Sequence, residues 1–120
     1  MGYADREAWE WPGALDALVA APDHHRLLLE NDDVRVLETR ISPGATVPVH
    51  THRWPSVLTL LSPGHAVRRD GEGRVLTAAS VTDALPVPGT TIWMAAMPPH
   101  SVENIGGAEI HLLTVELKRC

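Results

Sequence analysis

Short apolar runs separated by turn-forming residues dominate the sequence from residue 24 onward. Residues 34–41 and 110–117 alternate between two kinds of side chain, as expected of strands whose two faces differ. Residues 56–61 are nearly all apolar, which indicates a strand covered on both sides. The remaining predicted strands are residues 24–30, 65–69, 74–78 and 90–96.

One helix is predicted, over residues 12–21. Leu15, Leu18 and Val19 fall on one helical face, while Pro12 suits a first turn and Pro22 ends the pattern. Residues 83–89 are predicted to form a loop because two prolines interrupt them. We therefore expect an all-β domain over residues 23–120, preceded by a tail and short helix over residues 1–22.

Two histidines of the segment 44–56 have the spacing of metal ligands. His50 and His52 are two residues apart among β-branched residues, so in a strand both imidazoles leave the same face. Each offers one lone pair to a divalent ion, and His100 is the candidate for a third nitrogen. The alternative is that these histidines are hydrogen-bonded structural residues without an ion.

The surroundings of these histidines resemble the two motifs of the cupin family, over about residues 30–117. The matching residues are Gly44, His50, His52 and Gly64 for the first motif, and His100 and Asn104 for the second. The resemblance implies a single-domain jelly-roll barrel, also called a double-stranded β-helix. It also implies a divalent ion, Fe, Mn, Ni or Zn, held by the three histidines.

The chain departs from the first motif at one ligand. The cupin pattern expects a glutamate where this chain has Ser56 and Val57, so the resemblance supports three histidine ligands at most. Asn104 is expected to cap its own backbone rather than to coordinate. Four other histidines lack ligand spacing and are expected to be structural: His24, His25, His65 and His111.

Several residues are candidates for contact with a substrate. Trp54 lies two residues beyond a predicted ligand, and Trp93 and Met94 could line a pocket or serve as packing. Ser56 stands at the position of the missing glutamate. Arg53 could clamp an anionic substrate or be a surface charge.

Composition excludes several classes of partner. The 120 residues suit one domain, with 44% hydrophobic and 21% charged residues. A net charge of −5 provides no basic patch for nucleic acid. No apolar run is long enough to cross a membrane and no secretory signal is recognisable, so a cytoplasmic protein is expected. Cys120 is the only cysteine, so an internal disulfide is not expected.

Together these observations predict a small cupin-like metalloprotein. The first hypothesis is a metal-dependent enzyme of the dioxygenase, isomerase, cyclase or lyase type that acts on a small anionic or chelating organic substrate. The alternative is a non-catalytic cupin that binds or senses a small molecule. A homodimer is expected because Trp9 and Trp11 place two large apolar side chains in an otherwise polar tail.

Overall fold

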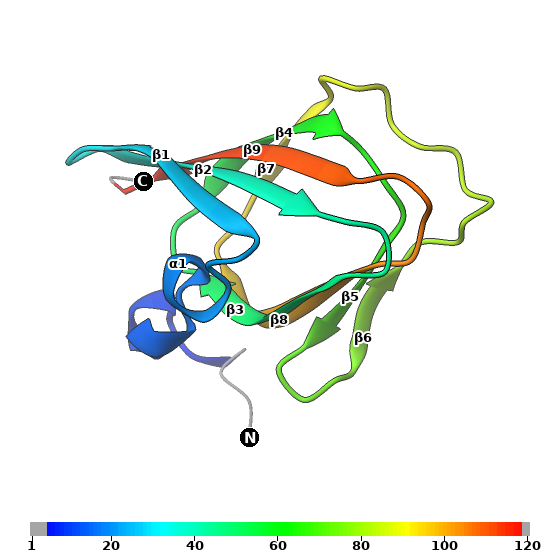
Figure 1. Ribbon diagram of the computed structural model, residues 1–120. Helices are drawn as coiled ribbons and strands as arrows, with labels where there is room; N and C mark the ends of the chain where they lie inside the picture. The colour runs from blue at the N-terminus through cyan, green and yellow to red at the C-terminus, as the bar shows by residue number, and fades with distance from the viewer. Residues whose placement is uncertain (1–4, 119–120) are drawn as a thin grey trace.

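The computed structural model describes residues 5–118, so Cys120 lies outside the described residues. Two antiparallel sheets face each other and enclose the interior (Figure 1). Strand order is β1-β2-β9-β4-β7 in the first sheet and β3-β8-β5-β6 in the second. The strands are β1 (His25–Glu30), β2 (Val34–Ile41), β3 (Thr46–His52), β4 (Ser56–Ser62), β5 (Ala66–Asp70), β6 (Val75–Ala78), β7 (Thr91–Met94), β8 (Met97–Asn104) and β9 (Ile110–Leu117).

The all-β prediction is confirmed, and most strands begin and end close to their predicted positions. The main difference is β8, which is not among the predicted strands. The predicted strand 90–96 ends at Met94, and the chain enters the other sheet at Met97. Residues 83–89 form no strand, in agreement with the prediction of a loop. No helix within residues 5–118 is long and apolar enough to cross a membrane.

The N-terminal helix is shorter than predicted, because Asp16 has an extended backbone that divides it. A 3-10 turn, η3 (Gly13–Leu15), precedes this residue, and α1 (Ala17–Ala20) follows it. The Asp16 carboxylate caps α1 by accepting a hydrogen bond from the backbone of Leu18 at 3.1 Å. The break in the helix thus places Asp16 beside β3. There Asp16 forms an isolated β-bridge with Thr51.

The predicted apolar face of this helix is confirmed only in part, since Leu15 and Leu18 are half-buried. Val19 is exposed, whereas Ala17 and Ala21 are completely buried. Helix α1 lies against β1 and β3 (Figure 1). The side chains buried there are therefore the small ones. Trp11 is also buried, but Trp9 is 74% exposed, so the predicted homodimer now depends on Trp9 alone and stays a prediction.

The structure explains why glycine stands at two positions of the first cupin-like motif. Gly44 has φ of +81°, a left-handed conformation that glycine adopts without steric cost, and it turns the chain into β3. At Gly64, a Cβ atom would lie 2.5 Å from the side chain of Ile110. The turn after β4 therefore lies directly against the first residue of β9.

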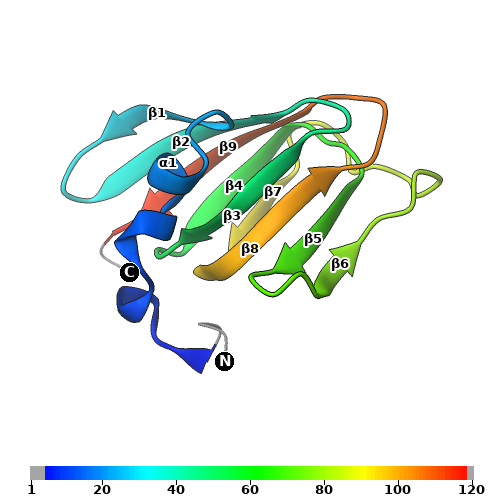
Figure 2. The same ribbon diagram turned by 60° about the horizontal axis from the view of Figure 1, so that its bottom comes forward.

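A small group of buried apolar side chains forms the hydrophobic core. Its centre is a cluster from α1, β2, β3 and β9, and the cluster comprises Ala21, Ile41, Val47 and Ile110. Figure 2 shows β3, β8, β5 and β6 side by side as one wall of the barrel. The polar residues of the interior lie beyond this core, on the same inward-facing sides of the strands.

Candidate metal centre

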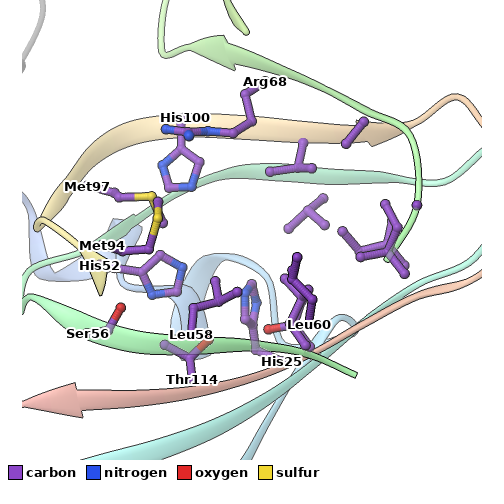
Figure 3. A pocket seen from close by; sticks show the side chains of 18 of the residues that line it. His25, His52, Ser56, Leu58, Leu60, Arg68, Met94, Met97, His100 and Thr114 are labelled. Carbon is purple, nitrogen blue, oxygen red and sulfur yellow. The ribbon is translucent and has the colours of Figure 1, made fainter. Parts of the chain in front are cut away.

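Four imidazoles gather in the interior of the barrel: His25 of β1, His50 and His52 of β3, and His100 of β8. The ring centroid of His50 lies 4.8 Å from His25, 5.0 Å from His52 and 4.3 Å from His100. Figure 3 shows His25, His52 and His100 directed into one cavity. The cluster therefore contains histidines from both sheets.

Strand pairing explains how these rings meet. His50 and His100 are direct partners in the antiparallel pair β3–β8, so their side chains leave the same face of the sheet. His52 is two residues further along β3 and shares that face. His25 enters from the opposite sheet, where it pairs with Thr39 of β2.

Each imidazole is oriented by a hydrogen bond from its Nδ1 atom to an acceptor. The Nδ1 of His25 lies 3.0 Å from the carbonyl of Ala21. The acceptors for His50 and His100 are the carbonyls of Pro48 and Pro98, each at 2.8 Å, and His52 uses the carboxylate of Glu116 at 2.8 Å. An Nδ1 that donates leaves Nε2 unprotonated in a neutral ring, so four lone pairs are available for a ligand.

Burial keeps three of these rings neutral. Desolvation, together with the neighbouring His52, lowers the pKa of His25 to about 4. The pKa of His50 falls to about 2 through burial and the nearby His100. Burial likewise lowers the pKa of His100 to about 3, against the opposing effect of its bond to Pro98. Neutral imidazole is the form that binds a metal, so no proton has to leave these rings at neutral pH.

The cluster could hold a metal ion. The ligand atoms of His25, His50 and His52 all lie within 4.8 Å of one another. Two opposed nitrogens at a metal distance of about 2.1 Å would be about 4.2 Å apart, so the three atoms are near coordinating separation. All three residues are buried, and nitrogen ligands suit Zn, Fe, Ni and related ions.

His52 is supported by a chain of buried charges. Glu116, which is 0% exposed, accepts from His52 and also from Arg35, whose Nε lies 2.5 Å from Oε1. The Arg35 guanidinium then forms a two-pronged ion pair with Asp16, at 2.9 and 3.0 Å. Burial alone would raise the pKa of Glu116, but the hydrogen bonds from His52 and Arg35 lower it. His25, His50, His52 and His100 form a four-histidine cage. The network places a carboxylate behind this cage, where it can stabilise a cation without coordinating it.

The structure places His25, for which the sequence predicts only a structural role, among the residues that could hold an ion. No sequence spacing connects His25 with the other three, because it reaches the cluster from a separate strand of the opposite sheet. The other histidines predicted to be structural lie outside the cavity lining and bond to protein groups. Their partners are the carbonyl of Arg40 for His24, the carbonyl of Asp83 for His65 and the carboxylate of Glu38 for His111.

One repeated pattern does indicate the cage in the sequence. Pro48-Val49-His50 and Pro98-Pro99-His100 each place a proline two residues before a ligand candidate. In both cases the proline carbonyl accepts from Nδ1 of the histidine. Asn104, by contrast, caps its own turn as predicted, since its Oδ1 accepts from the backbone of Gly106 at 3.0 Å.

The histidines line a cavity of about 220 Å³. Most of its other walls are apolar, and the aliphatic and thioether side chains include Leu58, Leu60, Met94, Met97, Val102 and Leu112. A pocket with apolar walls and a few convergent polar groups is typical of small-molecule sites. Of the predicted substrate contacts, Ser56 and Met94 are in this lining.

The other three predicted contacts do not line the cavity. Trp93 is 57% exposed on β7. The ring of Trp54 packs outside, with the Arg35 guanidinium 5.0 Å from its centroid. Arg53 is partly exposed and, like Trp54, lies in the turn between β3 and β4, so the alternation of β3 no longer directs it inward. The structure instead brings an unpredicted arginine, Arg68 of β5, to the cavity wall.

The chain is similar to known proteins in structure rather than in sequence. No family model and no curated protein matches the sequence. A cupin domain from Bordetella pertussis aligns with 78% of this chain and 91% of its own, with a TM-score of 0.63 and 22% identity. The polyketide cyclase RemF from Streptomyces resistomycificus aligns with 83% of this chain and 68% of its own, with a TM-score of 0.55 and 22% identity.

An RmlC-like cupin protein from Methanocaldococcus jannaschii, described as a double-stranded β-helix, has a TM-score of 0.55 at 12% identity. It covers 78% of this chain and 77% of its own. These likenesses establish the fold: the chain has the double-stranded β-helix seen in these proteins. The chain thus combines this fold with buried histidines that could hold a metal ion.

Proposed function

We propose that the protein is a metal-dependent enzyme acting on a small organic substrate that chelates the ion through a carbonyl, enolate or carboxylate oxygen. The observation that carries this proposal is the convergence of four imidazoles whose Nδ1 atoms are all engaged elsewhere. The ligand atoms that lie within 4.8 Å of one another belong to His25, His50 and His52. The proposal adds His100 as a fourth ligand, because its ring centroid lies 4.3 Å from that of His50 and it lines the same cavity. The alternative with purely structural histidines gives no reason for four desolvated lone pairs to face one cavity.

The residues divide the work between binding and orientation. His25, His50, His52 and His100 would hold Zn, Fe, Mn or Ni, and Glu116 would fix the ring of His52. Such an ion, when bound, supplies Lewis acidity that stabilises an enolate and, for iron, redox chemistry with dioxygen. Leu58, Met94 and Met97 exclude water and contact the apolar body of the substrate.

A second candidate function is binding without catalysis. It is favoured by the composition of the cavity wall, which holds no Asp, Glu, Lys or Tyr among residues 5–118. A proton transfer would therefore have to use a histidine or the substrate itself. The enzyme proposal is supported by analogy, because the polyketide cyclase RemF has a similar fold.

Metal content is the first test. Protein purified without a polyhistidine tag should contain close to one divalent ion per chain, measured by mass spectrometry of the elements. Replacing His25, His50, His52 or His100 singly by Ala should lower metal affinity, whereas His65→Ala and His111→Ala serve as matched controls outside the cavity. Glu116→Gln, which removes the charge behind His52, should weaken binding by roughly 10- to 100-fold. A wild type that binds no divalent ion on reconstitution would contradict the proposal.

Catalysis is tested separately on reconstituted protein. Acetylacetone, which chelates as an enolate, should change the visible spectrum of Co(II)-loaded wild type, and His100→Ala should lose that response. The loaded protein should then convert members of a panel of 1,3-diketones and 3-oxo acids, monitored through the enol absorbance, faster than the metal-free protein does. A spectral response without conversion of any member would favour the binding function.

A further inference from the structure

The cavity contains a cation that the histidine cage does not explain. Arg68 lies on β5 and lines the cavity together with the four histidines. Its Nε atom is buried and has no hydrogen-bond partner in the structure. Within residues 5–118, no carboxylate forms an ion pair with Arg68. A half-buried guanidinium without a counterion is costly in a folded protein unless a ligand supplies the partner.

Strand register directs Arg68 towards the cage. Arg68 pairs with Val102 of β8, two residues from His100 on the same face of that strand. Figure 3 shows Arg68 reaching the cavity wall beside His100. The charge of Arg68 also contributes to lowering the pKa of His100, after the larger effect of burial. The guanidinium is thus close to the site where the ion would bind.

The neighbouring arginine behaves differently, which shows that this arrangement is not a general property of β5. Arg69 points to the other face of the strand and forms an ion pair with Glu103 at 2.9 Å, with both side chains 35% exposed. The cavity wall has no equivalent of Glu103, because it contains no Asp or Glu among the described residues. The cavity therefore presents a fixed positive charge and neutral imidazoles to whatever enters it.

We infer that Arg68 is the anion-binding residue of the cavity and that the substrate is a small organic acid. Its carboxylate pairs with Arg68 while a carbonyl or enolate oxygen faces the histidine cage, and its apolar body contacts Met94 and Met97. A planar guanidinium with several N–H donors suits a carboxylate in two-pronged geometry. The placement of the second oxygen rests on the proposed function, whereas the charge contact does not require an ion.

The test compares two probes of the same shape and different charge. Benzoate and benzamide are titrated by calorimetry into protein treated with a chelator and into metal-loaded protein. Wild type should bind benzoate more tightly than benzamide in both states. Arg68→Gln should weaken benzoate binding by roughly 10- to 100-fold, the loss expected for a charge-assisted hydrogen-bonded pair, with benzamide affected far less.

Arg69→Gln is the matched control, since it removes an equal charge from the adjacent position on the opposite face, and it should keep wild-type affinity. Equal benzoate affinity in wild type and Arg68→Gln would overturn the inference. So would an equal loss in Arg69→Gln, or a wild type that binds no benzoate at millimolar concentration. Unfolding curves for each variant verify that the fold is retained.

Metal content measured on the same samples separates this inference from the proposed function. If the chelator-treated protein binds benzoate through Arg68 but no ion can be loaded, the inference stands and the metal-dependent function fails. If the ion binds while benzoate affinity is insensitive to Arg68, only the inference fails.

Discussion

The two polar regions of the cavity differ in how the protein satisfies them. At the cage, every histidine has an acceptor for Nδ1, and Glu116 is held in turn by Arg35. At the other region, Arg68 has a buried Nε with no partner. Arg35 is buried and Arg68 is half-buried, yet among residues 5–118 only Arg35 has carboxylates against it. Arg35 is thus neutralised by the protein itself, whereas Arg68 keeps an unsatisfied charge that a ligand could pair.

The pKa directions of the two arginines follow the same division. Burial would lower the pKa of Arg35, but its bonds to Asp16 and Glu116 raise it. For Arg68, burial lowers the pKa and nothing opposes it. The two side chains should therefore respond in opposite ways when each is replaced by an apolar residue.

The largest effect is expected from Arg35→Met. The change leaves Asp16 without its ion pair and leaves Glu116 buried with only His52 as a partner, so unfolding free energy should fall by about 3–5 kcal/mol. Urea denaturation of the metal-free protein measures this loss. Arg69→Met is the control, because its exposed pair with Glu103 should be worth about 1 kcal/mol or less. A loss at Arg35 no larger than that at Arg69 would mean that the network does not stabilise the fold.

The neutral cage predicts that acid destabilises the metal-free protein well above the pKa of ordinary carboxyl groups. The folded pKa values of about 4, 2 and 3 for His25, His50 and His100 lie below the unfolded value of 6.5. Below pH 6.5 the unfolded chain therefore binds protons that the folded chain does not, and stability falls as pH falls.

Between pH 6.5 and 5.5 this loss should be about 1 kcal/mol for each of the three histidines. Urea denaturation across that range in the presence of a chelator measures the slope, and His25→Gln should reduce it by one histidine's share. A stability that stays constant over the same range would show that the rings are not held neutral by burial.

A strand pattern predicts which residues of one strand share a face, but it does not predict which strands meet across the barrel. The sequence pattern predicts every strand except β8, and the two-residue spacing predicts that His50 and His52 share one face. The placement of His25 depends on how the opposite sheet closes over β3, and residue spacing does not contain that information. Arg68 and Arg69 are adjacent and chemically identical, so only the register of β5 against β8 decides which one enters the cavity.

The misplaced substrate contacts have a similar cause. Arg53 and Trp54 follow His52 directly, but β3 ends at His52 and the chain turns before β4, so the inward direction of the strand does not extend to them. Val19 fits the apolar face of a continuous helix, whereas the break at Asp16 rotates Ala17 towards the barrel instead. In each case the periodicity of a strand or helix does not apply to residues beyond the point where that element ends.

The smallest effect, and the sharpest contrast with Arg35, is expected from Arg68→Met. The variant removes a desolvated cation that no protein group satisfies, so the free energy of unfolding should stay the same or rise by about 1 kcal/mol. Added benzoate should then stabilise wild type by mass action, through binding to the folded state, and should stabilise the variant much less. Urea denaturation with and without benzoate measures both quantities. A loss comparable to that of Arg35→Met would show that Arg68 has a protein partner of its own, and the distinction between the two arginines would then disappear.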